Sequence, residues 1–227
     1  MRLPKGCDIL TGKVVLLNKA VYGLKQAERQ WNLKLVKTFT DEMGLDQSKS
    51  DPCLFKMMRG DRVVLITAVH VDDMIVAAET EYLCDCFYAE LRRMFPSTDL
   101  GNLSWYLGRA FERNLDKGTL RMSQSAFIDS MVSCFEIETE SELPAFTTGD
   151  LGPKRDDEAD CDMPVMAAVG CLLWVAGNTR PNVANPIRAI ALHSHNPSLR
   201  HWKGLRKIMG YLKGTRDLGV VFGGEVA

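Results

Sequence analysis

The stretch "VVLITAVHVDDMIVAAE", from Val63 to Glu79, places two adjacent aspartates, Asp72 and Asp73, inside one of the most apolar passages of the chain. Charged side chains are rarely buried without a partner, so two acids in this setting need an explanation. The β-branched residues before them predict a strand, and the run "MIVAA" after them predicts a second one. The simplest arrangement is a hairpin with both acids at or beside its turn, where they escape burial.

A helix and a further strand are predicted upstream of this hairpin. Between Ala27 and Met43 an apolar residue recurs at every fourth position, and the pattern ends at Gly44, which suits a helix C-cap. The run "SDPCLFKM" is joined to the strand by the glycine-containing turn "MRGD", which predicts a second hairpin. A hydrophobic sheet edge near Val63 to Val71 is nevertheless expected to be uncovered in the isolated chain, which would make the chain prone to aggregation.

Downstream of the acids, patterns typical of helices and of strands follow one another. A helix is predicted from Tyr82 to Phe95, because Pro96 cannot continue it. The runs "SWYLGRAFERN" and "GTLRMSQ" flank the turn signal "LDKG" and predict a β-hairpin, followed by a helix in "SQSAFIDSMVSCF" with a serine N-cap.

The last third of the chain is predicted to be helical. Ten acids gather with Pro and Gly between Glu136 and Asp162, which indicates an exposed linker or long loop. Three helices are expected after it, over Pro164 to Ala176, Pro181 to Leu192, and Leu199 to Leu212.

Bulk composition narrows the class of protein. The chain has 227 residues, of which 46% are hydrophobic, and a net charge of -1, so its average electrostatics do not favour nucleic acid. Its apolar runs are shorter than the roughly 20 residues of a membrane span, and a soluble intracellular protein is expected.

The seven cysteines form no C-x-x-C pair, which favours reduced thiols over zinc at Cys84 and Cys86. His193, His195 and His201 are more suggestive as metal ligands, but no Cys or carboxylate joins them at metal-site spacing, which favours positions on helix ends or loops.

The aspartate pair can have three uses. Two adjacent carboxylates can hold Mg²⁺, which prefers oxygen ligands and leaves positions for water or phosphate. A protonated dyad of the aspartic-protease kind is disfavoured, because neither D-T-G nor D-S-G occurs in the sequence. The third possibility is an ordinary Asp-Asp turn, and the dipeptide alone leaves this choice open.

Three ordered segments supply the context: "LNKAVYGLKQAERQW" from Leu17, "MGLDQSKSDPCLF" from Met43, and "HVDDMIVA" from His70. Together they resemble the reverse transcriptase of copia-type LTR retrotransposons. The resemblance continues through "DLGNLSWYLG", "LRMSQSAFIDSMVSCF", "VGCLLWVAGNTRPNV" and "HWKGLRKIMGYLKGT", so that it covers nearly the whole chain.

This resemblance implies an α+β fold, namely part of a right-hand polymerase palm with an antiparallel sheet and helices, followed by a mostly helical thumb and connection. The implied divisions are an incomplete palm over 1–118, a thumb-like region over 119–145, an acidic linker over 146–162, and a helical connection region preceding RNase H over 163–227.

The resemblance also implies site residues. Asp72 and Asp73 match the carboxylates of the family's Tyr/Phe-x-Asp-Asp motif, which implies that they coordinate two Mg²⁺ (or Mn²⁺) ions at the primer 3′ end. The residue matching the family's tyrosine is His70, which would lie near the nucleotide. Other implied contacts are those of Gly23, Lys25 and Gln26 with nucleotide or template, and a primer grip at Trp105, Tyr106, Leu107 and Gly108. For Trp105 and Tyr106, packing in the core is an equally good interpretation.

A basic segment from Arg200 to Arg216 contains no acid and is interleaved with Trp202 and Tyr211. It is interpreted either as a solvated helix face or as a surface that follows a nucleic-acid backbone. The residues proposed for backbone contact are Lys203, Arg206, Lys207 and Lys213.

The family has a third catalytic aspartate on an earlier strand, and the sequence starts, at "MRLPKGC", just after the segment that would carry it. Asp8 lacks the strand context to replace that ligand. We therefore expect a polymerase domain that has no fingers and is inactive as an isolated chain. The alternative is a non-enzymatic retrotransposon remnant that binds nucleic acid or protein.

The resemblance also implies partners, namely an RNA or DNA template with primer, deoxynucleoside triphosphates, and neighbouring RNase H and integrase, with no membrane. The implied location is intracellular, in cytoplasmic virus-like particles or the nucleus.

Overall fold

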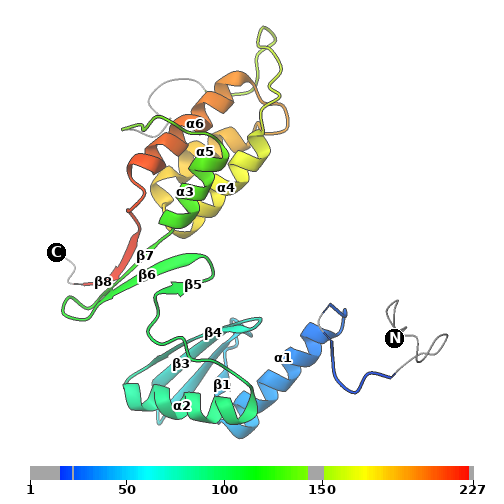
Figure 1. Ribbon diagram of the computed structural model, residues 1–227, viewed down its shortest axis with the longest axis vertical. Helices are drawn as coiled ribbons and strands as arrows, with labels where there is room; N and C mark the ends of the chain where they lie inside the picture. The colour runs from blue at the N-terminus through cyan, green and yellow to red at the C-terminus, as the bar shows by residue number, and fades with distance from the viewer. Residues whose placement is uncertain (1–15, 22, 143–150, 225–227) are drawn as a thin grey trace. The chain divides into compact units, whose positions relative to one another are not determined.

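A computed structural model describes residues 16–21, 23–142 and 151–224. The chain forms two compact units, Met1–Gly101 and Asn102–Ala227, and each contains a four-stranded antiparallel sheet and helices (Figure 1). The expected α+β class is confirmed. None of the described helices is both long and apolar enough to cross a membrane.

The first unit is a sheet in the order β1-β2-β3-β4 with helices on one face. Its elements are α1 (Ala27–Lys37), the single π-helical turn η2 (Thr38–Glu42), β1 (Asp46–Gln47), β2 (Leu54–Arg59), β3 (Arg62–His70), β4 (Asp73–Ala78) and α2 (Glu81–Met94). The predicted helix and both predicted hairpins are therefore confirmed. The helical segment ends at Glu42 with Met43 as its C-cap, and Gly44 follows with a φ of +68°, where a side chain would be strained.

The helices cover the sheet because aromatic side chains fill the space between them. Phe39 of η2 makes edge-to-face contacts with Phe55 of β2 and Phe87 of α2, at ring-centroid distances of 4.9 and 5.9 Å. Leu65 and Val69 of β3 are buried in the same cluster. Alternate residues of β3 thus fix one face of this strand against the helices.

The expectation of an uncovered edge at Val63 to Val71 is wrong. Strand β3 is central: it pairs with β2, with Leu54 opposite Ala68, and with β4, with Ala68 opposite Ile75. Both neighbours come from hairpins within the same stretch of chain. Among the described residues, the outer strands of this sheet are β1, which has two residues, and β4, which has six.

The second unit combines a sheet in the order β5-β6-β7-β8 with a helical core. Its elements are β5 (Trp105–Tyr106), β6 (Arg109–Asn114), β7 (Thr119–Ser123), α3 (Ser125–Cys134), α4 (Val165–Asn178), the 3-10 turn η4 (Pro181–Val183), α5 (Ala184–Ala191), α6 (Leu199–Gly214) and β8 (Val220–Gly223). The hairpin and the three late helices are confirmed, with Pro181 at the first position of η4. The predicted serine N-cap of α3 is wrong, because the N-cap is Gln124 and no side chain caps the helix.

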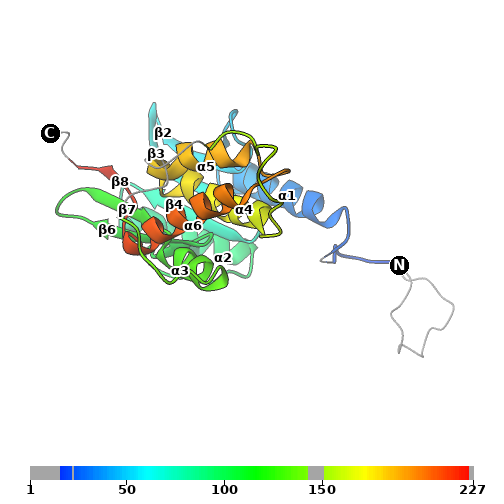
Figure 2. The ribbon, with the colours of Figure 1, turned by 90° about the horizontal axis from the view of Figure 1, so that it is seen from above.

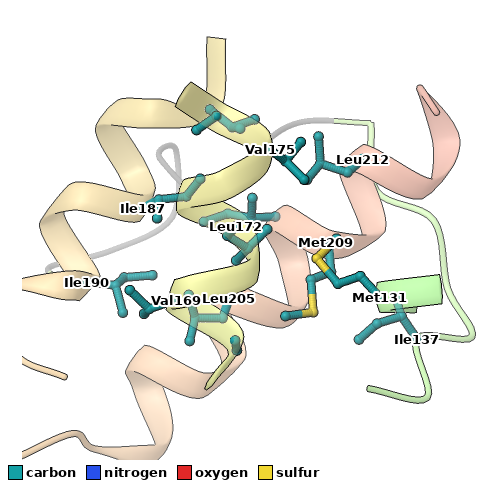
Figure 3. Close-up of a cluster of buried hydrophobic side chains, with 14 of the residues drawn as sticks. Met131, Ile137, Val169, Leu172, Val175, Ile187, Ile190, Leu205, Met209 and Leu212 are labelled. Carbon is teal, nitrogen blue, oxygen red and sulfur yellow. The ribbon is translucent and has the colours of Figure 1, made fainter. Parts of the chain in front are cut away.

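The core of this unit lies between α3, α4, α5 and α6, and Figures 1 and 2 both show α3 beside α6. In Figure 3, Leu172 of α4, Ile187 of α5 and Leu205 of α6 belong to one buried cluster, and Met131 of α3 meets Met209 of α6. The segments 119–145 and 163–227 therefore share a core. Their assignment to thumb and connection remains a prediction.

The described part of the acidic segment, residues 151–162, contacts the start of α6. The ring of His201, which is fully buried, accepts a hydrogen bond from the backbone N–H of Ser198 at Nδ1 and donates to the Gly152 carbonyl through Nε2, each at 2.9 Å. Arg200 donates to Glu158 through Nε (2.9 Å) and Nη2 (3.1 Å). The α6 N-terminus is thereby capped and joined to this loop.

The close approach of α6 to the chain after α3 gives a first prediction. A β-carbon at Gly210 would lie 2.8 Å from the backbone oxygen of Thr139, so Gly210→Ala should lower the free energy of unfolding by about 1–3 kcal/mol. Gly170→Ala in α4 is the matched control: no atom lies within 4 Å, and the change should stabilise by about 0.5–1 kcal/mol. Urea denaturation of both variants measures this difference, and the same sign for both would contradict the packing.

The ion pair at α6 gives a second prediction. The hydrogen bonds from Arg200 and from the backbone N–H of Arg155 lower the pKa of Glu158 from 4.5 to about 2. Because the folded-state pKa is lowered, this group stabilises the fold above pH 4.5 and loses that contribution as pH falls from 4.5 towards 2. Glu158→Gln should therefore flatten the decline of the unfolding free energy in this window, whereas the exposed neighbour Asp157→Asn should not. If the unfolding free energies of wild type and Glu158→Gln fall equally with pH between 4.5 and 2, the assignment is overturned.

Candidate functional site

The aspartate pair lies at the tip of the hairpin between β3 and β4. His70 and Asp73 face each other across the two strands, and Val71 and Asp72 form the two-residue loop. Both aspartate side chains are exposed. The acids thus escape burial at the turn, as the sequence predicts.

The backbone of this turn is unusual. Val71 has a φ of +57°, in the left-handed region, whereas Asp72 is absent from the residues with positive φ. This is the sign pattern of a type II′ turn, in which glycine normally occupies the first loop position. A β-branched residue there is a clear outlier and costs on the order of 1–2 kcal/mol. Such strain is typical of functional sites.

A hydrogen bond from α1 reaches the strained residue. The indole Nε1 of Trp31 donates to the carbonyl oxygen of Val71 at 2.9 Å. Beneath the turn, the hydroxyl of the buried Thr67 donates to the carbonyl of Ile75 at 3.0 Å, which adds a side-chain bond between β3 and β4. Sequence reasoning assigned Trp31 only to the apolar stripe of the helix, and no pattern in the sequence shows its polar contact.

One face of the first sheet adjoins the acids. Since side chains alternate along a strand, His70, Ala68 and Ile66 share the face opposite to the helices, and Asp73 joins it as the cross-strand partner of His70. Ile66 is 42% exposed although β3 is central, so solvent reaches this face. A bound molecule could therefore approach the carboxylates over the sheet.

The residues predicted to contact nucleotide or template lie at the start of α1. Gly23 has a φ of +88°, and Lys25 and Gln26 are exposed, with Gln26 at the N-cap position and making no capping bond. Between one and two helical turns separate Gln26 from Trp31, the residue bonded to the aspartate turn. The structure thus connects this segment to the turn through one helix, and its role remains a prediction.

The predicted primer grip is a second tight turn, in the second unit. Leu107 and Gly108 both have positive φ, +48° and +76°, between β5 and β6, as in a type I′ turn. Trp105 is 54% exposed, so the interpretation of this residue as core is wrong; Tyr106 is half-buried. The sequence reasoning missed the neighbouring Arg109, whose guanidinium lies 5.1 Å from the ring of Trp174.

The basic segment on α6 has intramolecular partners. Arg206 donates to the carbonyls of Phe135 and Glu136, and Lys213 to those of Ile137 and Glu138. Lys203 is exposed, and Lys207 also interacts within the chain. These bonds attach α6 to the chain after α3, and a contact of the four cations with a nucleic-acid backbone remains a prediction.

The aspartate pair is the metal donor set that the sequence predicts. Within the described ranges, no three or more His, Cys, Asp or Glu residues gather where they could hold an ion. Burial raises the pKa of the Cys84 and Cys171 thiols, which disfavours the thiolate that zinc requires. Adjacent exposed carboxylates do fit the chemistry of Mg²⁺, which commonly takes one or two protein carboxylates together with water and phosphate oxygens.

Comparisons with known proteins identify the family of the chain. The family described as reverse transcriptase (RNA-dependent DNA polymerase) matches residues 1–145. The chain is 29% identical to the Retrovirus-related Pol polyprotein from transposon TNT 1-94 of Nicotiana tabacum, over 99% of this chain and 18% of that protein. It is also 29% identical to the Pol polyproteins from transposons RE2 and RE1 of Arabidopsis thaliana, over 91% of this chain and 14% of each relative.

The chain thus spans less than a fifth of the length of these three curated relatives. No solved structure matches it. The match to the family covers more than half of the chain and includes the aspartate turn together with α1. The relatives belong to the copia-type transposons that the sequence motifs resemble. The chain therefore belongs to the reverse transcriptase family and represents the reverse transcriptase domain of a copia-type retrotransposon polyprotein.

Proposed function

We propose that Asp72 and Asp73 coordinate the divalent ions for nucleotidyl transfer onto a primer 3′-hydroxyl, the reaction of an RNA-directed DNA polymerase. The observation that carries this proposal is the strained, exposed turn at Val71, which presents both carboxylates at the end of the β3–β4 hairpin. An ordinary surface hairpin has no need for a β-branched residue in the left-handed region.

Divalent ions are general in this family, and we propose Mg²⁺, or Mn²⁺ in its place, at Asp72 and Asp73. When bound, two such ions would activate the 3′-hydroxyl and neutralise the departing pyrophosphate. The contribution of the chain is to hold two anionic oxygens at a fixed turn and to keep them accessible. His70, across the ladder from Asp73, would place a flat polar ring beside the nucleotide.

A two-metal site needs a further carboxylate. The family carries it on a strand that precedes the segment matching α1, and the described residues supply no third acid near the pair. Since β4 is an outer strand and begins at Asp73, a strand added along β4 would bring its own side chains next to this turn. We propose that the third ligand enters there.

We propose Gly23, Lys25 and Gln26 for nucleotide or template, the turn at Trp105 to Gly108 for the primer, and the exposed Lys203 for the phosphate backbone. RNase H and integrase are proposed neighbours, because the similar proteins are Pol polyproteins. An intracellular location, cytoplasmic or nuclear, rests on the family alone.

Titration calorimetry with Mg²⁺ and Mn²⁺ tests the metal ligands. Asp72→Asn removes one anionic ligand and should abolish the binding heat, whereas Asp61→Asn, at the exposed β2–β3 turn of the same sheet, should retain it. Identical heats for wild type and Asp72→Asn would falsify the assignment.

Primer extension on an RNA template with Mg²⁺ then tests the reaction. If wild type and Asp61→Asn incorporate nucleotides and Asp72→Asn does not, the result supports catalysis by this chain. Incorporation that persists in Asp72→Asn contradicts the role of Asp72. Metal binding without incorporation in any of the three proteins fits a polymerase domain that is inactive as an isolated chain, and absence of both metal binding and incorporation favours the second candidate, a non-enzymatic remnant.

A further inference from the structure

We propose that Trp31 is the positioning residue of the aspartate turn: its indole N–H holds the Val71 carbonyl and thereby sets the direction in which Asp72 and Asp73 project. This inference rests on the proposed metal-binding role of the two acids. It concerns a hydrogen bond between residues 40 positions apart, which joins α1 to the tip of the β3–β4 hairpin.

The first step is the geometry of one peptide unit. The Val71 carbonyl and the Asp72 N–H belong to the same planar group, so fixing the direction of the carbonyl also fixes the plane on which Asp72 begins. The indole donates to this oxygen at 2.9 Å, a normal hydrogen-bond length. The backbone of Asp72 is thereby oriented by a side chain of α1.

The second step is that this turn needs such a bond. Val71 occupies a conformation that its β-branched side chain disfavours, with φ at +57°. Its side chain is 54% exposed and supplies little packing to compensate. A hydrogen bond that favours this peptide orientation offsets part of the conformational strain at Val71.

The third step is the rigidity of the donor. The Trp31 ring meets Phe95 edge to face, with centroids 5.2 Å apart, and Phe95 is buried in the core of the first unit. Lys34 lies over the ring of Phe95, its Nζ 5.1 Å from the centroid. The indole is therefore held by packing against the core, and α1, which also carries Lys25 and Gln26 at its start, is connected to the two acids.

Trp31→Phe tests the bond, because phenylalanine keeps an aromatic ring at this position and removes the N–H donor, although its single ring is smaller than the indole. Trp174→Phe, at a 43% exposed tryptophan of the second unit, is the matched control. Mn²⁺ binding is followed in the full chain by the paramagnetic broadening of the Asp72 and Asp73 amide resonances. We expect Trp31→Phe to weaken Mn²⁺ binding about five- to tenfold, the usual effect of one lost hydrogen bond, and Trp174→Phe to leave it unchanged.

A second substitution separates positioning from general support of the fold. Glycine adopts positive φ without strain, so Val71→Gly should make the turn independent of the indole. In the Val71→Gly background, Trp31→Phe should weaken Mn²⁺ binding by less than about twofold. If Trp31 acted only through packing, the loss would be equal in both backgrounds, and that result would overturn the proposal.

The same spectra keep this inference distinct from the metal assignment. Without metal, the backbone ¹³C and amide shifts of Asp72 should change in Trp31→Phe and return towards the Val71→Gly values in the double variant. Unchanged Asp72 shifts in Trp31→Phe overturn the positioning role, whatever the metal does. Shifts that change as expected while wild type binds no Mn²⁺ support the positioning of the turn and remove the metal role of the pair.

Discussion

The left-handed backbone at Val71 is the constraint on which the candidate site depends. A two-residue loop between twisted antiparallel strands requires positive φ, and glycine would satisfy this requirement without strain. The chain instead places valine there, and Trp31 of α1 donates a hydrogen bond to the strained peptide. The consequence is an exposed turn with Asp72 in its loop and Asp73 at the start of β4, and with a hydrogen bond from outside the hairpin. Such a turn suits a site that must meet a metal ion in a defined direction.

The second unit uses polar contacts differently, to attach its helices to irregular segments. Arg206 and Lys213 on α6 donate to four consecutive backbone carbonyls, from Phe135 to Glu138, beyond the end of α3. Arg180, fully buried, donates to the carbonyl and hydroxyl of Thr215 just after α6, and burial lowers its pKa. Cations are favourable at these positions because helix C-terminal carbonyls lack partners. A cluster of basic residues on a helix can therefore serve the fold as well as a ligand.

Much of the secondary structure could be predicted from the sequence because the patterns are local. The four-residue spacing of Trp31, Leu35 and Phe39 identified one helix, and the β-branched run before Asp72 identified β3. Strand β8 was missed because "VVFGG" is short and pairs with β7, about a hundred residues earlier in the chain. The two predicted hairpins share β3 and already imply its central position, so the expectation of an uncovered edge at this strand conflicted with them.

The position of the site could be predicted from the sequence, but its backbone conformation and its hydrogen bonds could not. The dipeptide Asp72-Asp73 and its flanking strands indicated a hairpin tip, and the family motifs indicated its chemistry. The positive φ of Val71 had no sequence signal, because a β-branched residue argues against that conformation. The bond from Trp31 was equally hidden, because an aromatic residue in a helical stripe indicates packing and says nothing of its N–H.

The most direct measurement is the anomalous scattering of Mn²⁺ in crystals of the chain grown or soaked with that ion. The account predicts a peak at the β3–β4 turn, within coordination distance of carboxylate oxygens of Asp72 or Asp73, with Val71 at positive φ and bonded to Trp31. A peak confined to other carboxylates, with this turn free of metal, would contradict it.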